Sequence, residues 1–555
     1  MSSNDIKKSN VKHIDNNKKF LTEKSIFVII AMWIARIISV SKDMIIARCL
    51  GGSYVASAFI FASNISVPFK KIFGQGVLLQ VLIPIYYNEI VKNKGTENSR
   101  NMIGSIIIVT SLIMIISSIL LFILYHMFTS CFINTPRVNL VIPLLPTFLI
   151  YAIITGISGS FLGILNLNKY LFLPTITPML FNIMLIPILL IHRTESPEII
   201  VLYSRWSIIA SAVIQTSILT YLLIKGGIVP NLFLGIKTAI KTVINKINKI
   251  GLYALLSASL VELGRITPWI ILFIIGQHSV ATTNFGRALL RLPILLTTGI
   301  GIVSIVSFTR LASEKNFNKL FETFKYLMRQ TYYIIIPIVI FTVLFKFKLV
   351  DILYGGYRFD LQAIEQTAYI ALFFILEAPF KCTLKIIQPI FYAMNRSPTI
   401  IAVDVTCIFI KFTLLALSVI FKMKETGIAL AMTMTTAIQY LILQFILNKD
   451  YVEYMNKFTG IITSILKGTI ASLICGIIAF LFHTKIFEFI NNTKIFIVNG
   501  NFINKFINAN IILLDGLLYI ILYLLICKLI RSIEQIEIFD CLKQKYFGKK
   551  NIQQI

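Results

Sequence analysis

Long apolar runs constrain the fold of this chain more than any other feature of its sequence. They recur from Ile26 to Ile530, each about 20 residues long, and an α-helix of that length crosses a hydrocarbon core of about 30 Å. The composition agrees, because 57% of the residues are hydrophobic, only 14% are charged and the mean hydropathy is +0.83. The runs lack the period-2 alternation of a membrane β-barrel. We therefore predict an all-α polytopic membrane protein with about 14 transmembrane helices.

Positive charge is in large excess, with 52 Lys and Arg residues against 24 Asp and Glu residues. Most of these cations lie in the polar tails and in alternate loops, such as those around Lys92 and Lys246. This bias follows the positive-inside rule and predicts that both termini are cytoplasmic. The loop with Lys422 and Lys424 breaks the rule, and so does the lysine-containing insertion at 484–510. A nucleic-acid partner is not expected, because no folded basic domain exists outside the apolar runs.

A long polar loop at 225–252 divides the predicted spans into roughly six before it and eight after it. From Leu234 to Ile250 its apolar residues recur at helical spacing opposite lysines, a pattern typical of an amphipathic helix on a membrane surface. We interpret this segment as a cytoplasmic linker between two bundles. A contact with a soluble partner is the alternative interpretation.

Charged residues stand inside the first two apolar runs, where a lipid-facing helix tolerates them poorly. The first run contains Arg36, Lys42 and Asp43, and the second contains Lys70. A charge at the bilayer centre costs about 2.5–3.5 kcal/mol on insertion scales, and Arg36 lies too deep in its run to reach the interface easily. These residues predict a wet, cationic cavity inside a bundle and therefore an anionic substrate, with Asp43 neutralising one of the cations. Arg48, nearer the end of its run, fits an interfacial anchor equally well.

Neither catalysis nor metal binding is indicated by the sequence. The 7 cysteines are scattered without a CxxC pair, and the 5 histidines show no HExxH or other ligand spacing. The phosphate-binding pattern GxxxxGK(S/T) is missing, so ATP is not the expected direct energy source. We expect a transporter rather than an enzyme, without a cofactor, driven by the membrane potential or an ion gradient.

Several stretches share the pattern of one known family. The first, ARIISVSKDMIIARCLGG, contains Arg36, Lys42 and Asp43, and the second, VPFKKIFGQGVLLQVLIPIY, contains Lys70 and Pro84. Three more follow in the same order: LNLNKYLFLPTITPMLFNI, LYGGYRFD and LKIIQPIFYAMNRSPT. Together they resemble the MurJ/MviN family of lipid II flippases, over roughly residues 25–480.

The resemblance implies a fold of the multidrug/oligosaccharidyl-lipid/polysaccharide exporter type, with two six-helix bundles plus two C-terminal helices. The domains expected on this basis are a cytoplasmic basic tail (1–24), an N-terminal six-helix bundle (25–224), a cytoplasmic amphipathic linker (225–252), a C-terminal six-helix bundle (253–448), two additional C-terminal helices (449–530) and a cytoplasmic tail (531–555).

The resemblance also implies a substrate and a role in the cell. The substrate is lipid II, the undecaprenyl-diphosphate-linked precursor of peptidoglycan, carried from the inner to the outer leaflet of the bacterial plasma (inner) membrane by alternating access. Cell wall biogenesis and cell shape would depend on this step, and the expected partners are lipid II, the lipid bilayer and cell-wall synthesis proteins.

The site implied by the resemblance is a diphosphate cavity inside the two bundles. Charge-assisted hydrogen bonds from fixed cations suit a diphosphate, and the candidate residues are Arg36, Lys42, Lys70 and Arg287. The candidate charge partners are Asp43, Glu262, Arg265 and Arg291. The last two helices, at about 461–482 and 511–530, are expected to line a lipid groove that Lys467 faces.

The chain departs from the family pattern at several acidic positions. Ser57 and Gln75 stand where the family carries acidic residues, and Arg287 stands at the acid of an expected Asp-Arg pair in helix eight. These departures make the predicted cavity more cationic than usual. Glu262 and Arg265, spaced i,i+3, are interpreted as a pair satisfied within their helix, although Glu262 replacing a lost carboxylate is the alternative.

Three other functions are weighed against lipid II transport. An antiporter for cationic drugs on the same fold predicts carboxylates in the cavity, whereas the predicted cavity is cationic. An exporter of another polyprenol-linked polysaccharide precursor would share the basic cavity, and only the collinear stretches argue against it. A membrane scaffold would not need Arg36 and Lys70 at membrane depth.

Overall fold

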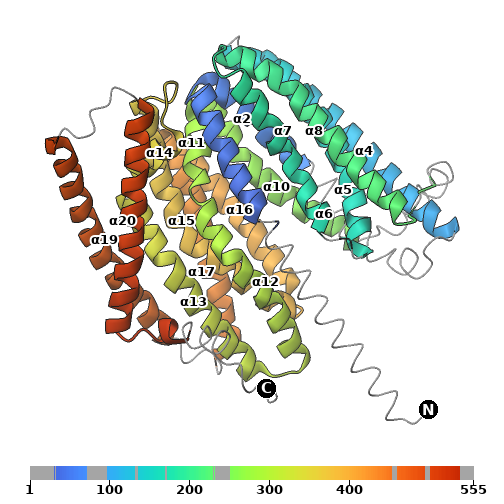
Figure 1. Cartoon of the computed structure of the whole chain (residues 1–555). Helices are drawn as coiled ribbons and strands as arrows, with labels where there is room; N and C mark the ends of the chain where they lie inside the picture. The colour runs from blue at the N-terminus through green and yellow to red at the C-terminus, as the bar shows by residue number, and fades with distance from the viewer. Residues whose placement is uncertain are drawn as a thin grey trace. The chain divides into compact units, whose positions relative to one another are not determined.

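The computed structural model describes residues 31, 33–69, 71, 97–131, 136–168, 170, 172–228, 230–231, 250–452, 459–493 and 501–537. All named elements of this part of the chain are helices (Figure 1), and the one bridge between extended residues joins Gly356 to Phe359. The predicted all-α membrane fold is thereby confirmed. Within the same residues, 10 helices are long and apolar enough to cross a membrane. The count of about 14 stays a prediction.

The chain forms two compact units, Met1–Ala281 and Thr282–Ile555. The predicted second bundle begins earlier, at residue 253, because in the sequence the long loop at 225–252 marks the boundary. Residues 232–249 of the predicted linker lie outside the described residues. The predicted domain boundaries therefore stay predictions, and each unit is described by itself below.

The first unit is built around α5, which contacts α2, α4 and α8. Its helices, blue to green in Figure 1, are residues 33–50, α2 (Tyr54–Phe69), α4 (Glu97–Cys131), α5 (Pro136–Leu167), α6 (Phe172–Ile176), the 3₁₀ turn η3 (Thr177–Met179), α7 (Leu180–Ile191), α8 (Pro197–Lys225) and α10 (Ile250–Ile275).

The sequence sets both ends of α8. Pro197 occupies its first turn, where no backbone N–H is needed. Gly227, with φ +70°, ends it, and the next amide donates back to the Leu223 carbonyl at 2.9 Å.

Small and hydroxyl residues join the helices of this unit. Thr110 of α4 and Ser160 of α5 share a hydrogen bond of 2.8 Å, and Gln215 of α8 donates to Ser158 at 3.1 Å. A Cβ added to Gly156 would stand 2.6 Å from the Met114 side chain, so α4 and α5 approach closely at this glycine. Close approach and inter-helix hydrogen bonds are the usual means of holding helices together in lipid.

The second unit is built around α15, which contacts α12, α13, α14, α16 and α17. Its helices are α12 (Arg291–Ser313), α13 (Phe317–Leu344), α14 (Lys346–Tyr354), α15 (Leu361–Ala393), α16 (Ser397–Ile420), α17 (Lys424–Asp450), α19 (Thr459–Thr493) and α20 (Asn501–Leu529). Helix α11 (Ser279–Ala288) runs across the division between the units. Buried aromatic and aliphatic side chains of α12, α13, α15, α16 and α17 form the core of the second unit.

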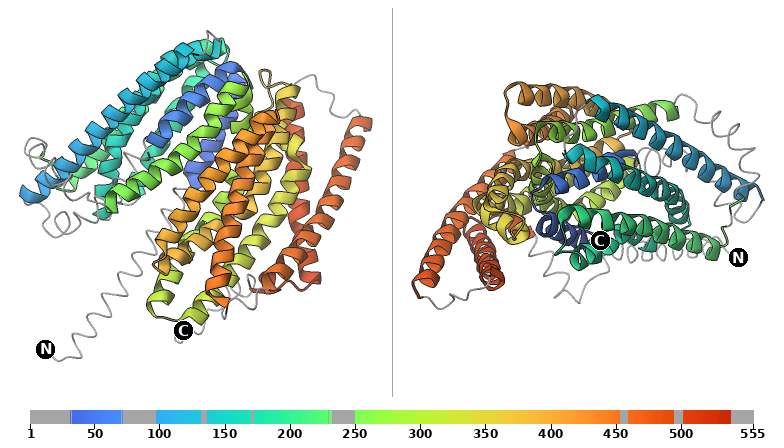
Figure 2. Two further views of the ribbon diagram at one scale, coloured as in Figure 1. Left: turned by 180° about the vertical axis from the view of Figure 1, so that it is seen from behind. Right: turned by 90° about the horizontal axis from the view of Figure 1, so that it is seen from above.

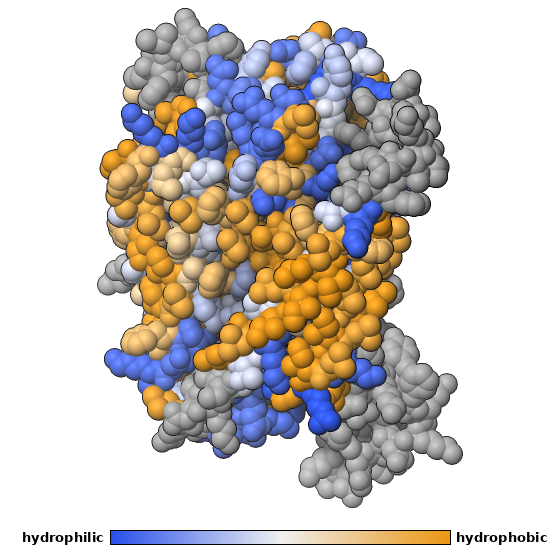
Figure 3. All heavy atoms as spheres, turned by 90° about the vertical axis from the view of Figure 1, so that its left-hand side faces the viewer, coloured by the Kyte–Doolittle hydropathy of each residue, from blue (hydrophilic) through white to orange (hydrophobic). Residues whose placement is uncertain are grey.

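Helices α19 and α20, at the red end of the colour bar in Figure 2, pack against each other, and α19 packs on α13. The contact contains a buried polar pair, since a ring nitrogen of His483 lies 2.7 Å from a carboxylate oxygen of Asp515. On the face shown in Figure 3, apolar side chains form a band with hydrophilic side chains at both ends. Outward residues of α19 and α20, such as Leu466 and Leu517, are more than half exposed, as expected of helices that face lipid.

A tyrosine of α20 compensates for a proline in α13. Pro337 lacks the amide that would donate to the carbonyl of Tyr333, four residues earlier. The hydroxyl of Tyr523 donates to that carbonyl instead, at 3.0 Å. Tyr519, one turn before Tyr523 on α20, donates to the carbonyl of Pro337 itself at 3.1 Å. The helix pair is therefore tied to α13 at the point where α13 lacks one of its own hydrogen bonds.

This geometry predicts that Tyr523→Phe destabilises the protein by about 1 kcal/mol, because it leaves a buried carbonyl without a donor. Pro337→Ala restores the amide of α13, so Tyr523→Phe is expected to cost less in a Pro337→Ala background. The measurement is a double-mutant cycle on thermal unfolding of the purified protein. An equal loss in both backgrounds would show that the tyrosine does not compensate for the proline.

Candidate functional site

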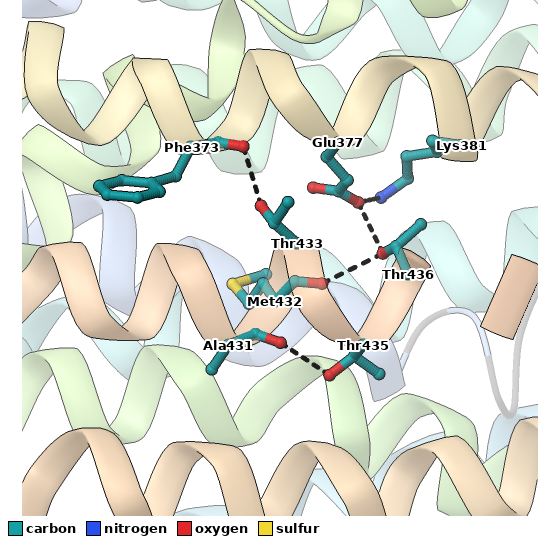
Figure 4. Close-up of polar contacts among 8 residues, drawn as sticks. All are labelled: Phe373, Glu377, Lys381, Ala431, Met432, Thr433, Thr435 and Thr436. Atoms are coloured by element: carbon teal, nitrogen blue, oxygen red, sulfur yellow. Dashed lines mark hydrogen bonds and ion pairs between the residues drawn. The ribbon is translucent and has the colours of Figure 1, made fainter. Parts of the chain in front are cut away.

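A buried carboxylate on α15 is the centre of a polar cluster in the second unit (Figure 4). The side chain of Glu377 is 1% exposed. One of its oxygens, Oε1, accepts hydrogen bonds from the ammonium of Lys381, one turn along the same helix, and from the hydroxyl of Thr436 on α17 at 3.0 Å. A carboxylate in a dry interior needs such partners, because burying an unpaired carboxylate costs on the order of several kcal/mol.

Threonines of α17 fix how this helix lies on α15. Thr433 donates to the backbone carbonyl of Phe373 at 2.9 Å, and Thr436 follows one turn later with its bond to Glu377. The hydroxyl of Thr436 also approaches the carbonyl of Met432, at 3.2 Å. Two cross-helix bonds spaced by one turn on both helices set the register of α17, and the buried carboxylate is part of that register.

Arg287 approaches the same cluster from α11. It lies in the last turn of that helix, where the helix dipole favours a cation. Its guanidinium stands 5.8 Å from the ring centre of Phe374 and acts electrostatically on Glu377, one turn further along α15. The preceding residue, Gly286, makes this approach possible, since a Cβ there would be 3.1 Å from backbone atoms of α15.

A second lysine of α15, Lys385, has a structural role. Its ammonium donates to the backbone carbonyl of Ile294 at 2.9 Å and to the hydroxyl of Thr298 at 2.8 Å, both on α12. The two helices come close here, because a Cβ added to Gly301 would be 3.4 Å from the Lys385 side chain. Lys385 therefore joins α12 to α15 by donating to groups that carry no full charge.

In the first unit, Lys42 and Asp43 form an ion pair with an N–O distance of 3.1 Å. The Asp43 side chain is 2% exposed and the Lys42 side chain 17%. The ammonium of Lys42 also stands 5.7 Å from the ring centre of Phe181. Arg36, two turns earlier on the same helix, is exposed. The helix thus presents a partly neutralised lysine and an accessible arginine.

Ser57, at a position where the family pattern has an acid, contacts the start of α11. Its hydroxyl, buried in the first unit, accepts a hydrogen bond of 3.2 Å from the backbone amide of Ala281. A nitrogen of the His278 ring lies 2.6 Å from the carbonyl of Gly52. Amides at the start of a helix lack partners within the helix, so Ser57 satisfies one of them.

The remaining predicted residues are placed as follows. Glu262 is buried and forms an ion pair with Arg265, the i,i+3 arrangement considered above. Arg291 is half-buried as the first residue of α12, and Lys467 is half-buried on α19. Lys70 and Gln75 lie outside the described residues.

The predicted site residues therefore fall into two sets, one in each unit. The first unit holds Arg36, Lys42, Asp43, Glu262 and Arg265, and the second holds Arg287, Arg291 and Lys467. Their roles toward a substrate stay predictions. Within the described residues, no group of three or more His, Cys, Asp and Glu side chains is arranged to hold a metal ion.

Glu377 and Lys381 are not among the site residues predicted from the sequence, and Lys385 stands only within one of the stretches that resemble the family. All three stand four residues apart within one apolar run, so they share one helix face. A charge inside an apolar run is the same signal that identified Arg36 and Lys42. Applied to every run, that criterion finds the cluster on α15.

Comparison with known proteins assigns the chain to a family. Residues 46–499 match the family model described as "MurJ: Lipid II flippase MurJ". A relative named "Probable lipid II flippase MurJ" from Buchnera aphidicola subsp. Acyrthosiphon pisum (strain APS) is 25% identical over 426 residues, which cover 74% of this chain and 80% of the relative.

Two solved structures show the same fold. "Lipid II flippase MurJ, inward closed conformation" matches with a TM-score of 0.70 and 19% identity, over 91% of this chain and 100% of that chain. The inward-facing structure of a multidrug resistance MATE family transporter of the MOP superfamily matches with a TM-score of 0.63 and 14% identity, over 76% of this chain and 96% of that chain. Since the family model covers most of the sequence, this chain belongs to the MurJ family of lipid II flippases.

Proposed function

We propose that this protein moves lipid II from the inner to the outer leaflet of the bacterial plasma membrane, for peptidoglycan synthesis. The observation that carries the proposal is the charge balance inside the helices. Arg36 and Lys42 accompany one carboxylate, Asp43, in the first unit. Arg287 and Lys381 share another, Glu377, in the second. Both sets keep an excess of positive charge, which favours an anionic diphosphate.

The proposed diphosphate site comprises Arg36, Lys42, Lys70 and Arg287, with Asp43, Glu262, Arg265 and Arg291 as charge partners. The polyprenyl tail stays in lipid, because burying it in protein would gain nothing over the bilayer. We assign it to the surface of α19 and α20, whose outward residues are apolar; Lys467 is the candidate residue beside it.

In the proposed mechanism an inward-open cavity takes the headgroup, the two bundles rock, and the headgroup is released outside. No covalent bond is made or broken, so the protein is a transporter without an enzymatic step. The membrane potential supplies about 2.3 kcal/mol per elementary charge per 100 mV, and an ion gradient is the other candidate drive. Cell-wall synthesis proteins are the proposed partners, and both termini are proposed to be cytoplasmic.

Export of cationic drugs is the alternative suggested by the likeness to the MATE family transporter. It would need carboxylates available to a cation. Asp43 and Glu377 are both buried, and each is paired with a lysine. The charge balance therefore favours an anionic substrate. Export of another polyprenol-linked polysaccharide precursor would use the same cations, and a direct test with lipid II separates it from the proposal.

The first prediction concerns the proposed diphosphate site. Arg36→Ala, Lys70→Ala and Arg287→Ala each remove a charge-assisted hydrogen bond, worth about 1.5–3 kcal/mol, and are expected to slow flipping by roughly tenfold or more. The measurement is a leaflet-accessibility assay for lipid II in cells depleted of the wild-type protein. Lys319→Ala, at an exposed position of α13, is the control and should be neutral. If cells that carry one of these variants accumulate no lipid II in the inner leaflet, the substituted residue is not part of the diphosphate site.

The second prediction concerns topology. A reporter that fluoresces only in the cytoplasm is expected to be bright when fused after Ile555. The same reporter inserted at Thr194, in the short turn between α7 and α8, is expected to be dark, because that loop carries few cations and is assigned to the outside. A bright signal at Thr194 with a dark C-terminal fusion would reverse the proposed orientation.

A further inference from the structure

The ion pair between Glu377 and Lys381 is accessible at one end. The carboxylate side chain is 1% exposed, whereas the lysine side chain is 33% exposed. Of the two carboxylate oxygens, Oε1 accepts both hydrogen bonds, and Oε2 is buried without a hydrogen-bond partner. A ligand therefore reaches this pair from the side of Lys381 and not from the side of the acid.

The two lysines of α15 are held differently, although they lie one turn apart. Lys385 donates to two groups of α12 and so connects two helices. Lys381 pairs with an acid of its own helix, four residues earlier. Movement of the Lys381 ammonium would leave the bonds of Thr433 and Thr436 between α15 and α17 in place. The ion pair of Lys381 with Glu377 lies within one helix, so this pair does not itself join α15 to another helix.

The carboxylate is also shared by two cations. Arg287 acts on Glu377 electrostatically, in addition to the direct contact of Lys381. If Lys381 turns away, Arg287 and the hydroxyl of Thr436 still stabilise the buried charge. A lysine ammonium has three donors, and a phosphate oxygen makes a stronger acceptor for them than a neutral group.

We propose that Lys381 binds the diphosphate of the transported lipid, and that Glu377 holds Lys381 in the empty protein and competes with the substrate for it. The proposal rests on the proposed function above. Glu377 is then a positioning residue that acts through Lys381. Its competition weakens binding, so that the headgroup leaves the site after the bundles have rocked; a site that passes its ligand on must not hold it too tightly.

The test uses the full-length protein purified in nanodiscs for lipid II binding and in vesicles for flipping. Lys381→Ala is expected to weaken binding by about tenfold or more, and Lys381→Arg to retain most of it. Glu377→Gln removes the competing charge, so it is expected to tighten binding severalfold while flipping becomes slower. Tighter binding with slower turnover is a combination that a merely structural residue would not produce.

Two controls keep the test open to failure. Glu365→Gln removes an exposed carboxylate near the start of the same helix, so it reports the general effect of one negative charge fewer and should change little. The double variant Glu377→Gln/Lys381→Met removes both charges of the ion pair together, so neither member is left buried without the other, and it is expected to fold. It should bind lipid II as weakly as Lys381→Ala does, because the ammonium that binds the diphosphate is missing. Recovery of wild-type binding would instead mean that the ion pair is structural.

The outcomes separate the inference from the proposed function. If the wild-type protein neither binds nor flips lipid II, the proposed function fails. If the wild-type protein does both and Glu377→Gln weakens binding as much as Lys381→Ala, the inference fails and the function stands. A thermal melt of each variant identifies any that lose binding only because they unfold.

Discussion

Hydrocarbon donates and accepts no hydrogen bonds, so polar groups at depth in this protein must be satisfied by the protein itself. The structure meets this requirement in three ways. Tyr523 supplies the donor that Pro337 removes from α13. The ammonium of Lys385 donates hydrogen bonds to a backbone carbonyl and a hydroxyl of α12. Glu377 accepts hydrogen bonds from a lysine and a threonine. Each of these hydrogen bonds joins a polar group to a neighbouring helix or to another turn of its own helix. The need to satisfy buried polar groups therefore also influences how the helices pack.

The same constraint distinguishes structural from functional charges. A charged group that donates to fixed groups on a neighbouring helix, as Lys385 does to α12, links the two helices. A pair with one buried and one accessible member, as Glu377 and Lys381 form, retains the capacity to bind something else. The Lys42–Asp43 pair has the same asymmetry, with side chains 17% and 2% exposed. Accessible cations beside sealed acids are the arrangement expected where an anion must bind and leave.

The fold class was predictable from sequence because the length of an apolar run depends only on the thickness of the membrane. Arg36 and Lys42 were found for the same reason, since a charge in such a run stands out without any knowledge of packing. The contacts of Ser57 and Glu377 were not predictable. Each depends on which residues of another helix lie opposite, and that register is set by contacts such as Thr433 with Phe373, which leave no periodic signal in the sequence.

The position of Arg287 shows why charge balance must be judged in space. By the family pattern an acid is expected at the position of Arg287 on α11, and an arginine there suggests a site whose positive charge is not neutralised. The structure brings Glu377 of α15 within electrostatic reach of this arginine, and Coulomb interactions depend on separation in space and not along the chain. A negative charge that interacts with this arginine therefore comes from another helix, α15. Because Glu377 is also bound to Thr436 of α17, the charge of Arg287 on α11 is coupled to the register of α15 and α17, which a neutralising acid on α11 itself would not achieve.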